Sequence, residues 1–298
     1  MKTISSGTVA VLGVFDGVHR GHQTLLRKAV SRSRRLKLPS VAVTFSPHPA
    51  AVLHPDKPRL LLSLDQRLEY IRAAGIDRVV VIPFTRAFSR WPARRFVQSV
   101  LIDRLRVREL VVGHDFRFGH DRAGNAVWLA RQGKQHGFKT WVIAPVRLGG
   151  RRVSSRTIRE WIASGELSRA KKALGRFPSV VGRVIHGGRR GRQLGFSTAN
   201  LRIEAGLLPP NGVYAAWARV ANRRYRAMVN IGVRPTFSKK EVRPRTEAHL
   251  LDFKASLYGR RLELEFIKRL RDEKKFASPA DLSAQLKKDA LRTLHLLS

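Results

Sequence analysis

The chain has 298 residues, enough for two domains of ordinary size, and a hydrophobic fraction of 43% that excludes a largely disordered protein. It contains no cysteine, which excludes disulfides, thiolate metal sites and cysteine nucleophiles. Lysine and arginine number 59 against 21 aspartates and glutamates, a net charge of +38.

The charge leaves two explanations open, a polyanionic partner and a general preference for arginine on solvated faces. Motifs typical of nucleic-acid binding domains are missing from the sequence, which weakens the first explanation. No apolar run approaches the roughly 20 residues that a membrane helix needs, and no secretory signal is visible. We therefore expect a cytoplasmic protein.

Short apolar segments alternate with longer amphipathic segments over the first part of the chain. The apolar segments predict strands, and the amphipathic segments predict helices of about 10–15 residues. The predicted strands are residues 8–12, 41–45, 79–84, 110–113 and 139–145. The predicted helices are residues 23–35, 64–74, 91–103, 126–136 and 155–164. This alternation is typical of a doubly wound parallel α/β sheet covered on both faces.

The stretch from Gly13 to His22 lies between the first predicted strand and the first predicted helix. A glycine-containing turn at a helix N-terminus binds anions, because backbone N–H groups and the helix dipole point outward together. His19 and His22 add donors that can follow the charge of a phosphate. His48 and Asp115 follow other predicted strands, at the sheet edge where ligands bind. A capping or core role for the two histidines stays open.

The pattern changes after residue 174, where short alternating runs are separated by glycine, proline and asparagine. These runs predict an antiparallel β-barrel. A final amphipathic helix is predicted at residues 279–297, with Ser278 as its N-cap and Pro279 as its first residue. The barrel strands are predicted at residues 180–185, 212–221, 225–231, 246–253 and 262–270. We place the boundary near Pro178, which gives domains 1–178 and 179–298.

Many widely spaced stretches of the chain match the motifs of one family. The chain resembles the bacterial bifunctional riboflavin kinase/FMN adenylyltransferases (FAD synthetases) from near its start to about Asp289. The matching stretches are residues 13–22, 45–49, 112–119, 153–159, 182–186, 191–192, 194–200, 208–214, 230–237, 247–253, 258–259 and 270–276.

For the first half, the resemblance implies a nucleotidyltransferase-type sheet that transfers an adenylyl group from ATP to FMN. His19 and His22 would bind the ATP phosphates and stabilise the transition state. His48 and Asp115 would lie on the flavin side, although Asp115 also suits a simple turn. The further positions implied to bind ATP or phosphate are Gly13, Phe15, Asp16, Gly21, Ser154, Ser155 and Arg159. Simple helix capping is the alternative for Ser154 and Ser155.

For the second half, the resemblance implies a riboflavin kinase barrel that transfers the γ-phosphoryl group of ATP to riboflavin. Thr198 and Asn200 would bind Mg²⁺, and Glu247 would act as the general base. A turn residue at Asn200 and a strand-edge charge at Glu247 are the plain alternatives. A basic loop would fold over the phosphates unless it is a solvated hairpin, and its named members are Gly187, Gly191 and Arg192.

Three positions depart from the family pattern. Ser197 replaces a usual proline, Arg156 a usual threonine and Ser46 a usual acidic residue. We expect an enzyme that makes FMN and then FAD from riboflavin, FMN and ATP, with no membrane partner. Nucleic acid is a possible but unnecessary partner, and the oligomeric state is open. The alternatives are a paralogue with one of the two activities and a basic nucleic-acid-associated protein on the same scaffold.

Overall fold

The computed structural model describes residues 7–298 apart from 56–58, 187–195, 222, 233–244 and 254. The chain divides into two compact units, Met1–Pro58 with Leu64–Ser155, and Arg59–Ser63 with Arg156–Ser298. Residues 156–178, which the sequence pattern places in the first domain, cluster with the second unit. The domain boundary at Pro178 stays a prediction.

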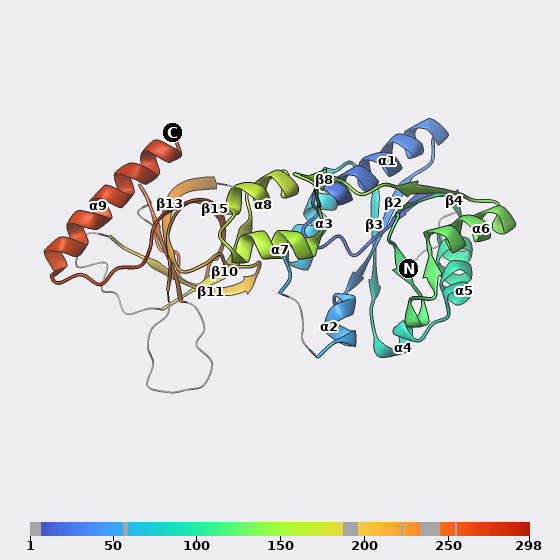
Figure 1. Ribbon diagram of the computed structural model, residues 1–298, viewed down its shortest axis with the longest axis horizontal. Coiled ribbons are helices and arrows are strands. Elements are labelled where there is room, and N and C mark those ends of the chain that lie inside the picture. The colour runs from blue at the N-terminus through green and yellow to red at the C-terminus, as the bar shows by residue number, and fades with distance from the viewer. Residues whose placement is uncertain (1–6, 56–58, 187–195, 222, 233–244, 254) are drawn as a thin grey trace. The chain divides into compact units, whose positions relative to one another are not determined.

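The first unit contains the expected parallel sheet (Figure 1). Its strand order is β3-β2-β1-β4-β7. Successive strands are added on one side of β1 up to β3 and on the other side from β4 onward, so the order of addition reverses between β1 and β4, although all strands stay parallel. In open α/β sheets ligands bind outside the carboxyl ends of the strands at such a reversal. The strands are β1 (Thr8–Leu12), β2 (Ser40–Ser46), β3 (Arg78–Pro83), β4 (Val107–Gly113) and β7 (Lys139–Ile143).

Helices and short ribbons connect these strands. They are α1 (Arg20–Leu36), α2 (Pro49–Leu53), α3 (Leu64–Ala73), α4 (Arg86–Ser89), α5 (Ala93–Phe96), π-helical η1 (Val97–Arg104), β5 (Arg117–Phe118), 3₁₀-helical η2 (His120–Arg122), β6 (Gly124–Asn125), α6 (Ala126–His136), β8 (Arg147–Leu148) and β9 (Arg151–Arg152). The helix predicted at residues 91–103 is thus divided, with α-helical turns only in α5 and a π-helix after it. Helices α2 and α4 were missed because four or five residues show no helical period.

The second unit contains a closed antiparallel barrel, as the alternating runs predict. Its strand order is β10-β11-β14-β13-β12-β15, and Figure 1 shows these strands closing a ring. The strands are β10 (Ser179–Ile185), β11 (Ala199–Ala205), β12 (Gly212–Val220), β13 (Arg223–Gly232), β14 (Arg245–Leu250) and β15 (Arg261–Arg271). The sequence pattern missed β11, whose outer positions carry the charges of Arg202 and Glu204 and whose residues include few strong strand formers.

Helices precede and follow the barrel strands along the chain. Helix α7 (Ser155–Ala163) was predicted, and α8 (Leu167–Leu174), only two turns long, was missed. The C-terminal helix α9 (Pro279–Leu296) begins as predicted, because the Ser278 hydroxyl accepts a hydrogen bond from the Asp281 N–H. No helix in the described part of the chain is both long and apolar enough to cross a membrane.

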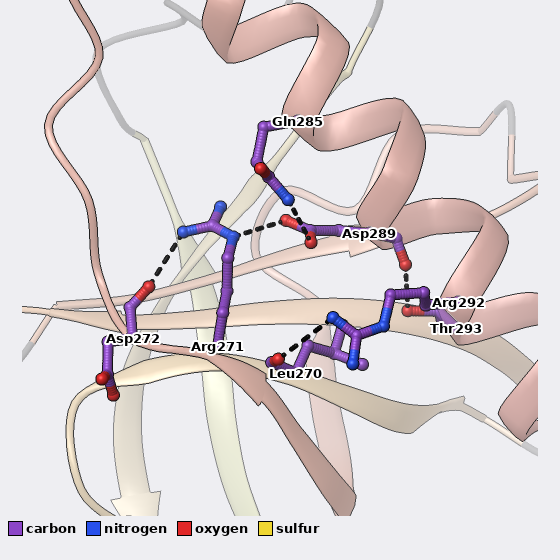
Figure 2. Close-up of polar contacts among 7 residues, drawn as sticks. All are labelled: Leu270, Arg271, Asp272, Gln285, Asp289, Arg292 and Thr293. Carbon is purple, nitrogen blue, oxygen red and sulfur yellow. Dashed lines mark hydrogen bonds and ion pairs between the residues drawn. The ribbon is translucent and has the colours of Figure 1, made fainter.

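A buried ion pair holds α9 against the barrel (Figure 2). Arg271 at the end of β15 donates from Nε to Asp289 Oδ2 over 2.8 Å. Gln285, one turn before Asp289, donates to the other carboxylate oxygen over 2.9 Å. The Asp289 side chain is fully buried, and each of its two carboxylate oxygens accepts one of these hydrogen bonds.

Candidate functional site

A cavity of about 1020 Å³ lies at the carboxyl end of the parallel sheet in the first unit. Residues that follow each of the five strands line it. The predicted site residues among its lining are Gly13, His19, Gly21, His22, His48, Asp115, Ser154 and Ser155. The fold therefore brings together, at the reversal of strand order, segments that lie more than a hundred residues apart.

Three predicted residues do not line this cavity. Phe15 and Asp16 are buried in the turn below it, with exposed fractions of 0% and 4%. Arg159 belongs to the second compact unit. Its role as a phosphate ligand stays a prediction.

The turn between β1 and α1 has an uncommon backbone. Phe15 and Val18 have φ values of 57° and 37°, and Gly17 between them has a φ of 84°. Positive φ is unfavourable for a β-branched residue such as valine, and such residues gather at functional sites. The turn leads directly into α1, whose N-cap is His19. The first turn of α1 holds no acidic residue, so its N-terminal N–H groups face no competing carboxylate from that turn.

The two histidine rings lie face to face. Their centroids are 3.7 Å apart and their planes differ by 18°, while Phe15 packs edge-on against His22. The His22 N–H points to His19 Nδ1 over a long 3.4 Å. A Cβ at Gly21 would lie only 3.1 Å from the His19 ring. Glycine between the histidines therefore leaves room for the stacked arrangement.

Two side chains from distant segments hold this turn. Ser155 Oγ donates to the Asp16 carbonyl over 2.8 Å. Arg67 of α3 is 4% exposed and donates to the carbonyl oxygens of Val14 and Phe45 over 2.8 and 2.9 Å. Burial lowers the pKa of Arg67, and the negative charge of Asp16 opposes that shift. No local pattern distinguishes Arg67, which lies on the short helix α3.

Asp115 faces the cavity beside two potential cations. It forms an ion pair with Arg152, and His114 Nδ1 lies 3.7 Å from its other oxygen. Partial burial on its own would raise the pKa of Asp115, but the hydrogen bond and charge of Arg152 outweigh it and hold the pKa below its ordinary value. Arg152 was missed at the sequence level because only the fold places it beside Asp115.

Aromatic side chains form another part of the cavity lining. Phe84 and Phe88 pack edge to face at 5.7 Å, and Phe88 lies 5.0 Å from Trp91. The aromatic residues of the lining are Phe45, Phe84, Phe88, Trp91, Phe96, Phe116 and Phe118. Phe45 lies near the end of β2 and the others follow β3 and β4, a recurrence that the sequence prediction of the site did not include.

A second group of predicted residues lies on the barrel. Asn200 on β11 pairs directly with Glu247 on β14. Arg245, two residues before Glu247, donates from Nε to Asn200 Oδ1 over 2.8 Å, and the same nitrogen is 2.7 Å from Glu247 Oε1. Thr198, just before β11, is exposed. The fold thus places the predicted base beside one predicted metal ligand, with an arginine between them.

The segment before Thr198 has a contact of its own. His249 Nδ1 lies 2.7 Å from the carbonyl oxygen of Ser197, and Phe196 packs edge-on against the His249 ring at 5.1 Å. This contact restrains the backbone at the position where the family usually has proline. The predicted basic loop with Gly187, Gly191 and Arg192 lies outside the described residues.

Comparison with known proteins covers both halves of the chain. A family model described as FAD synthetase matches residues 1–157, and one described as riboflavin kinase matches residues 174–297. The bifunctional riboflavin kinase/FMN adenylyltransferase of Escherichia coli strain K12 is 37% identical over 287 residues, which cover 96% of this chain and 91% of that protein. The Pseudomonas fluorescens protein of the same name is 38% identical over 283 residues, with 95% and 91% covered.

A solved structure extends the likeness to three dimensions. It is described as a macrolide-efflux protein from Streptococcus pneumoniae, and it is 32% identical to this chain with a TM-score of 0.87. The match covers 97% of this chain and 94% of the other. Together with the sequence relatives, it shows one arrangement of elements within each half. The chain belongs to the family of bifunctional riboflavin kinase/FMN adenylyltransferases.

Proposed function

We propose that His19 and His22 carry the adenylyl transfer, and Glu247 the phosphoryl transfer, of this bifunctional flavin-synthesising enzyme. The family makes FMN from riboflavin and ATP, and then FAD from FMN and a second ATP. The observation that supports the first assignment is the cavity, which gathers the histidine pair and the Ser154–Ser155 segment at one end of the sheet.

In adenylyl transfer, a phosphate oxygen of FMN attacks the α-phosphorus of ATP, and the bond from that phosphorus to the β-phosphate oxygen breaks. Pyrophosphate leaves and no enzyme group is modified. The nucleophile is already an anion, so the chain's contribution is alignment and stabilisation of negative charge. His19, His22 and the N–H groups at the start of α1 are placed for that task. Ser154, Ser155 and Arg159 are our proposed ligands of the departing phosphates.

The aromatic lining suits the flavin ring system, since large flat rings stack favourably on aromatic side chains. Phe84, Phe88 and Trp91 offer such faces within the same cavity. We assign His48 and Asp115 to the flavin side as well, with Arg152 as a neighbour that can meet the FMN phosphate. Gly13, Phe15, Asp16 and Gly21 shape the phosphate end in this proposal.

In phosphoryl transfer, the 5′-hydroxyl oxygen of riboflavin attacks the γ-phosphorus of ATP and ADP leaves. A neutral hydroxyl must lose its proton as the new bond forms, and a carboxylate is suited to accept it. Glu247 is the carboxylate that the barrel places beside Asn200. Its side chain is 25% exposed, which leaves part of it accessible to a substrate.

The oxygen donors near Glu247 fit Mg²⁺ as a partner of ATP. The described residues include no cluster of three or more histidine, cysteine, aspartate or glutamate side chains that would hold a metal alone. Magnesium bound with a nucleotide takes most of its ligands from phosphates and water, so few protein oxygens are needed. The Thr198 hydroxyl and the Asn200 amide oxygen would be those ligands. Held there by Thr198 and Asn200, Mg²⁺ would supply positive charge against the negative charge of the phosphates.

The alternatives from the sequence gain no support from the comparisons, since family models match both halves. We keep the cytoplasm as the proposed location, because a chain of this length without cysteine suits a reducing compartment. The proposed domain boundary is Pro178.

A product assay tests the assignment of both activities. Riboflavin incubated with Mg-ATP and the full chain should give FMN and then FAD, separated by anion exchange. Accumulation of FMN alone would refute the adenylyl-transfer assignment. Conversion of supplied FMN to FAD without any product from riboflavin would refute the kinase assignment.

A further inference from the structure

Arg245 is a charged residue of the barrel site to which no role has been assigned. Its Nε donates to Asn200 Oδ1 over 2.8 Å and lies 2.7 Å from Glu247 Oε1. The Arg245 and Glu247 side chains are 33% and 25% exposed, whereas Asn200 as a whole is 8% exposed. One permanently charged group therefore contacts both the proposed metal ligand and the proposed base.

The strand register explains this contact. Residues two apart on a strand point to the same face, which places Arg245 and Glu247 on one side of β14. Asn200 is directly opposite Glu247 on β11, so its side chain reaches the same side. The contact thus follows from the pairing of two strands in the closed barrel, and it needs no unusual backbone.

The contact opposes the proposed reaction at both side chains. Arg245 occupies the Glu247 oxygen Oε1, which the riboflavin hydroxyl would otherwise approach. An amide oxygen that accepts an N–H has one lone pair fewer for a metal ion. A divalent cation at the same oxygen would also be repelled by the guanidinium, which cannot release its proton.

We propose that Arg245 is a built-in counter-cation of the kinase site, which must leave Asn200 and Glu247 before the metal–nucleotide complex binds productively. The inference rests on the proposed roles of Asn200 and Glu247. Arg245 is a positioning residue in this account: it acts through those two side chains and not on the substrate. Its pairing with Asn200 and Glu247 lowers the fraction of molecules whose barrel site is ready to bind, and it therefore weakens the apparent affinity for the metal ion.

The test compares Arg245→Met with Arg245→Lys and with a control, Arg224→Met, in the full chain. Arg224 forms a similar ion pair with Glu265 over 2.7 Å, on β13 and β15 of the same barrel. Binding of Mg-ADP is measured by calorimetry, and the Mg²⁺ concentration for half-maximal FMN formation is measured separately. The rate at which each variant converts supplied FMN to FAD serves as a control, because a normal rate shows that its first unit is folded.

Arg245→Met should bind Mg-ADP at the barrel about fivefold more tightly and need correspondingly less Mg²⁺ for FMN formation. Arg245→Lys, which keeps the charge, should stay closer to the original chain, and Arg224→Met should not change either value. If Arg245→Met proves unstable, Arg245→Gln removes the charge while keeping an N–H donor, and it should show a smaller shift in the same direction.

An unchanged Mg²⁺ requirement in both neutral variants would overturn the proposal. A fall in the maximal rate of FMN formation without tighter Mg-ADP binding would overturn it too, because that pattern indicates a direct catalytic or purely structural role. A different result would refute the proposed role of Glu247 as the base, namely an undiminished rate of FMN formation by a Glu247→Gln chain.

Discussion

The two sites that we propose for ATP, the cavity of the first unit and the site on the barrel, differ in the kind of side chain they carry. The cavity is lined by two imidazoles, the Ser154–Ser155 segment and the start of α1, which can donate hydrogen bonds through imidazole or backbone N–H groups. The barrel presents acceptors in Glu247, Asn200 and Thr198. The nucleophiles explain the difference, because the FMN phosphate is already anionic whereas the riboflavin hydroxyl must lose a proton. A base is therefore needed at only one of the two sites.

The two sites also differ in how they are built. The two histidines of the cavity lie at a tight turn. Ser155 and Arg67, which are far from this turn in the sequence, hold it by hydrogen bonds. The acceptors of the barrel come from two adjacent strands whose register alone places Asn200 opposite Glu247. Changes in a turn should thus affect adenylyl transfer, and changes in barrel pairing should affect phosphoryl transfer.

Removing the proposed base should have the largest effect. Glu247→Gln keeps the shape of the side chain but cannot accept the hydroxyl proton, so FMN formation should fall by about 10²–10⁴-fold. FAD formation from supplied FMN should be unchanged. Initial rates of the two half-reactions check this, and an equal loss in both would break the contrast between the sites.

The buried ion pair under α9 should matter for the barrel unit alone. Asp289→Ala leaves Arg271 without its carboxylate in a largely buried position, which should lower the free energy of unfolding by about 3–5 kcal/mol. Denaturant unfolding followed by both half-reactions would show early loss of FMN formation. The double change Arg271→Met with Asp289→Leu should recover most of the stability, since neither charge is left alone. Equal destabilisation by the single and double changes would contradict this account.

A methyl group between the histidines should weaken the first site only. In Gly21→Ala the new Cβ would lie 3.1 Å from the His19 ring, so the ring must move by a few tenths of an ångström. Adenylyl transfer depends on such alignment and should slow about tenfold, with FMN formation unchanged. Thr24→Ala, on the exposed side of the same helix, is the control. A normal rate in Gly21→Ala would mean that the His19 position is not critical.

The smallest expected effect depends on pH and concerns the first unit. Glu109 on β4 accepts hydrogen bonds from Arg32 Nε and Trp141 Nε1, both over 2.7 Å. Burial would raise the pKa of Glu109, but these partners outweigh it and the pKa lies below its ordinary value. The stabilisation is complete above the ordinary glutamate pKa of about 4.3, and it is lost as the pH falls through the lower folded-state pKa.

Arg32→Gln should therefore lower the unfolding temperature of the first unit at pH 7 and by less at pH 3, which lies below the ordinary glutamate pKa, where this stabilisation is already being lost. Thermal unfolding of the two chains at both pH values measures the gap. A gap of the same size at pH 3 would show that the ionised carboxylate is not the source of the stabilisation.

Elements with strong local patterns were predictable from the sequence, and long-range contacts were not. The five parallel strands read as apolar runs because both faces of such a sheet are covered. Strand β11 was missed because charged residues occupy its outer positions and it lacks the usual strand formers. Helix α8 was missed because two turns give too little periodicity.

The site shows the same division. The histidine pair was predicted from a compact motif next to a helix start, and Ser154–Ser155 from the family resemblance; all four line the cavity. Arg152 and the aromatic lining were missed because only the fold brings them to the cavity, and Arg67 was missed because only the fold places it against the Val14 and Phe45 carbonyl groups. Arg245 becomes informative only through the pairing of β11 with β14. Short motifs thus indicate the chemistry, whereas the groups that tune it depend on the fold.

The two proposed sites act independently of each other, and a mixing experiment measures that independence. A His22→Ala chain should convert riboflavin to FMN but make no FAD, and a Glu247→Gln chain should convert only supplied FMN to FAD. With riboflavin and Mg-ATP, neither chain alone should give FAD, whereas an equal mixture should give FAD at a substantial rate. Loss of both half-reactions in either single variant, or a mixture that makes FMN but no FAD, would contradict the account.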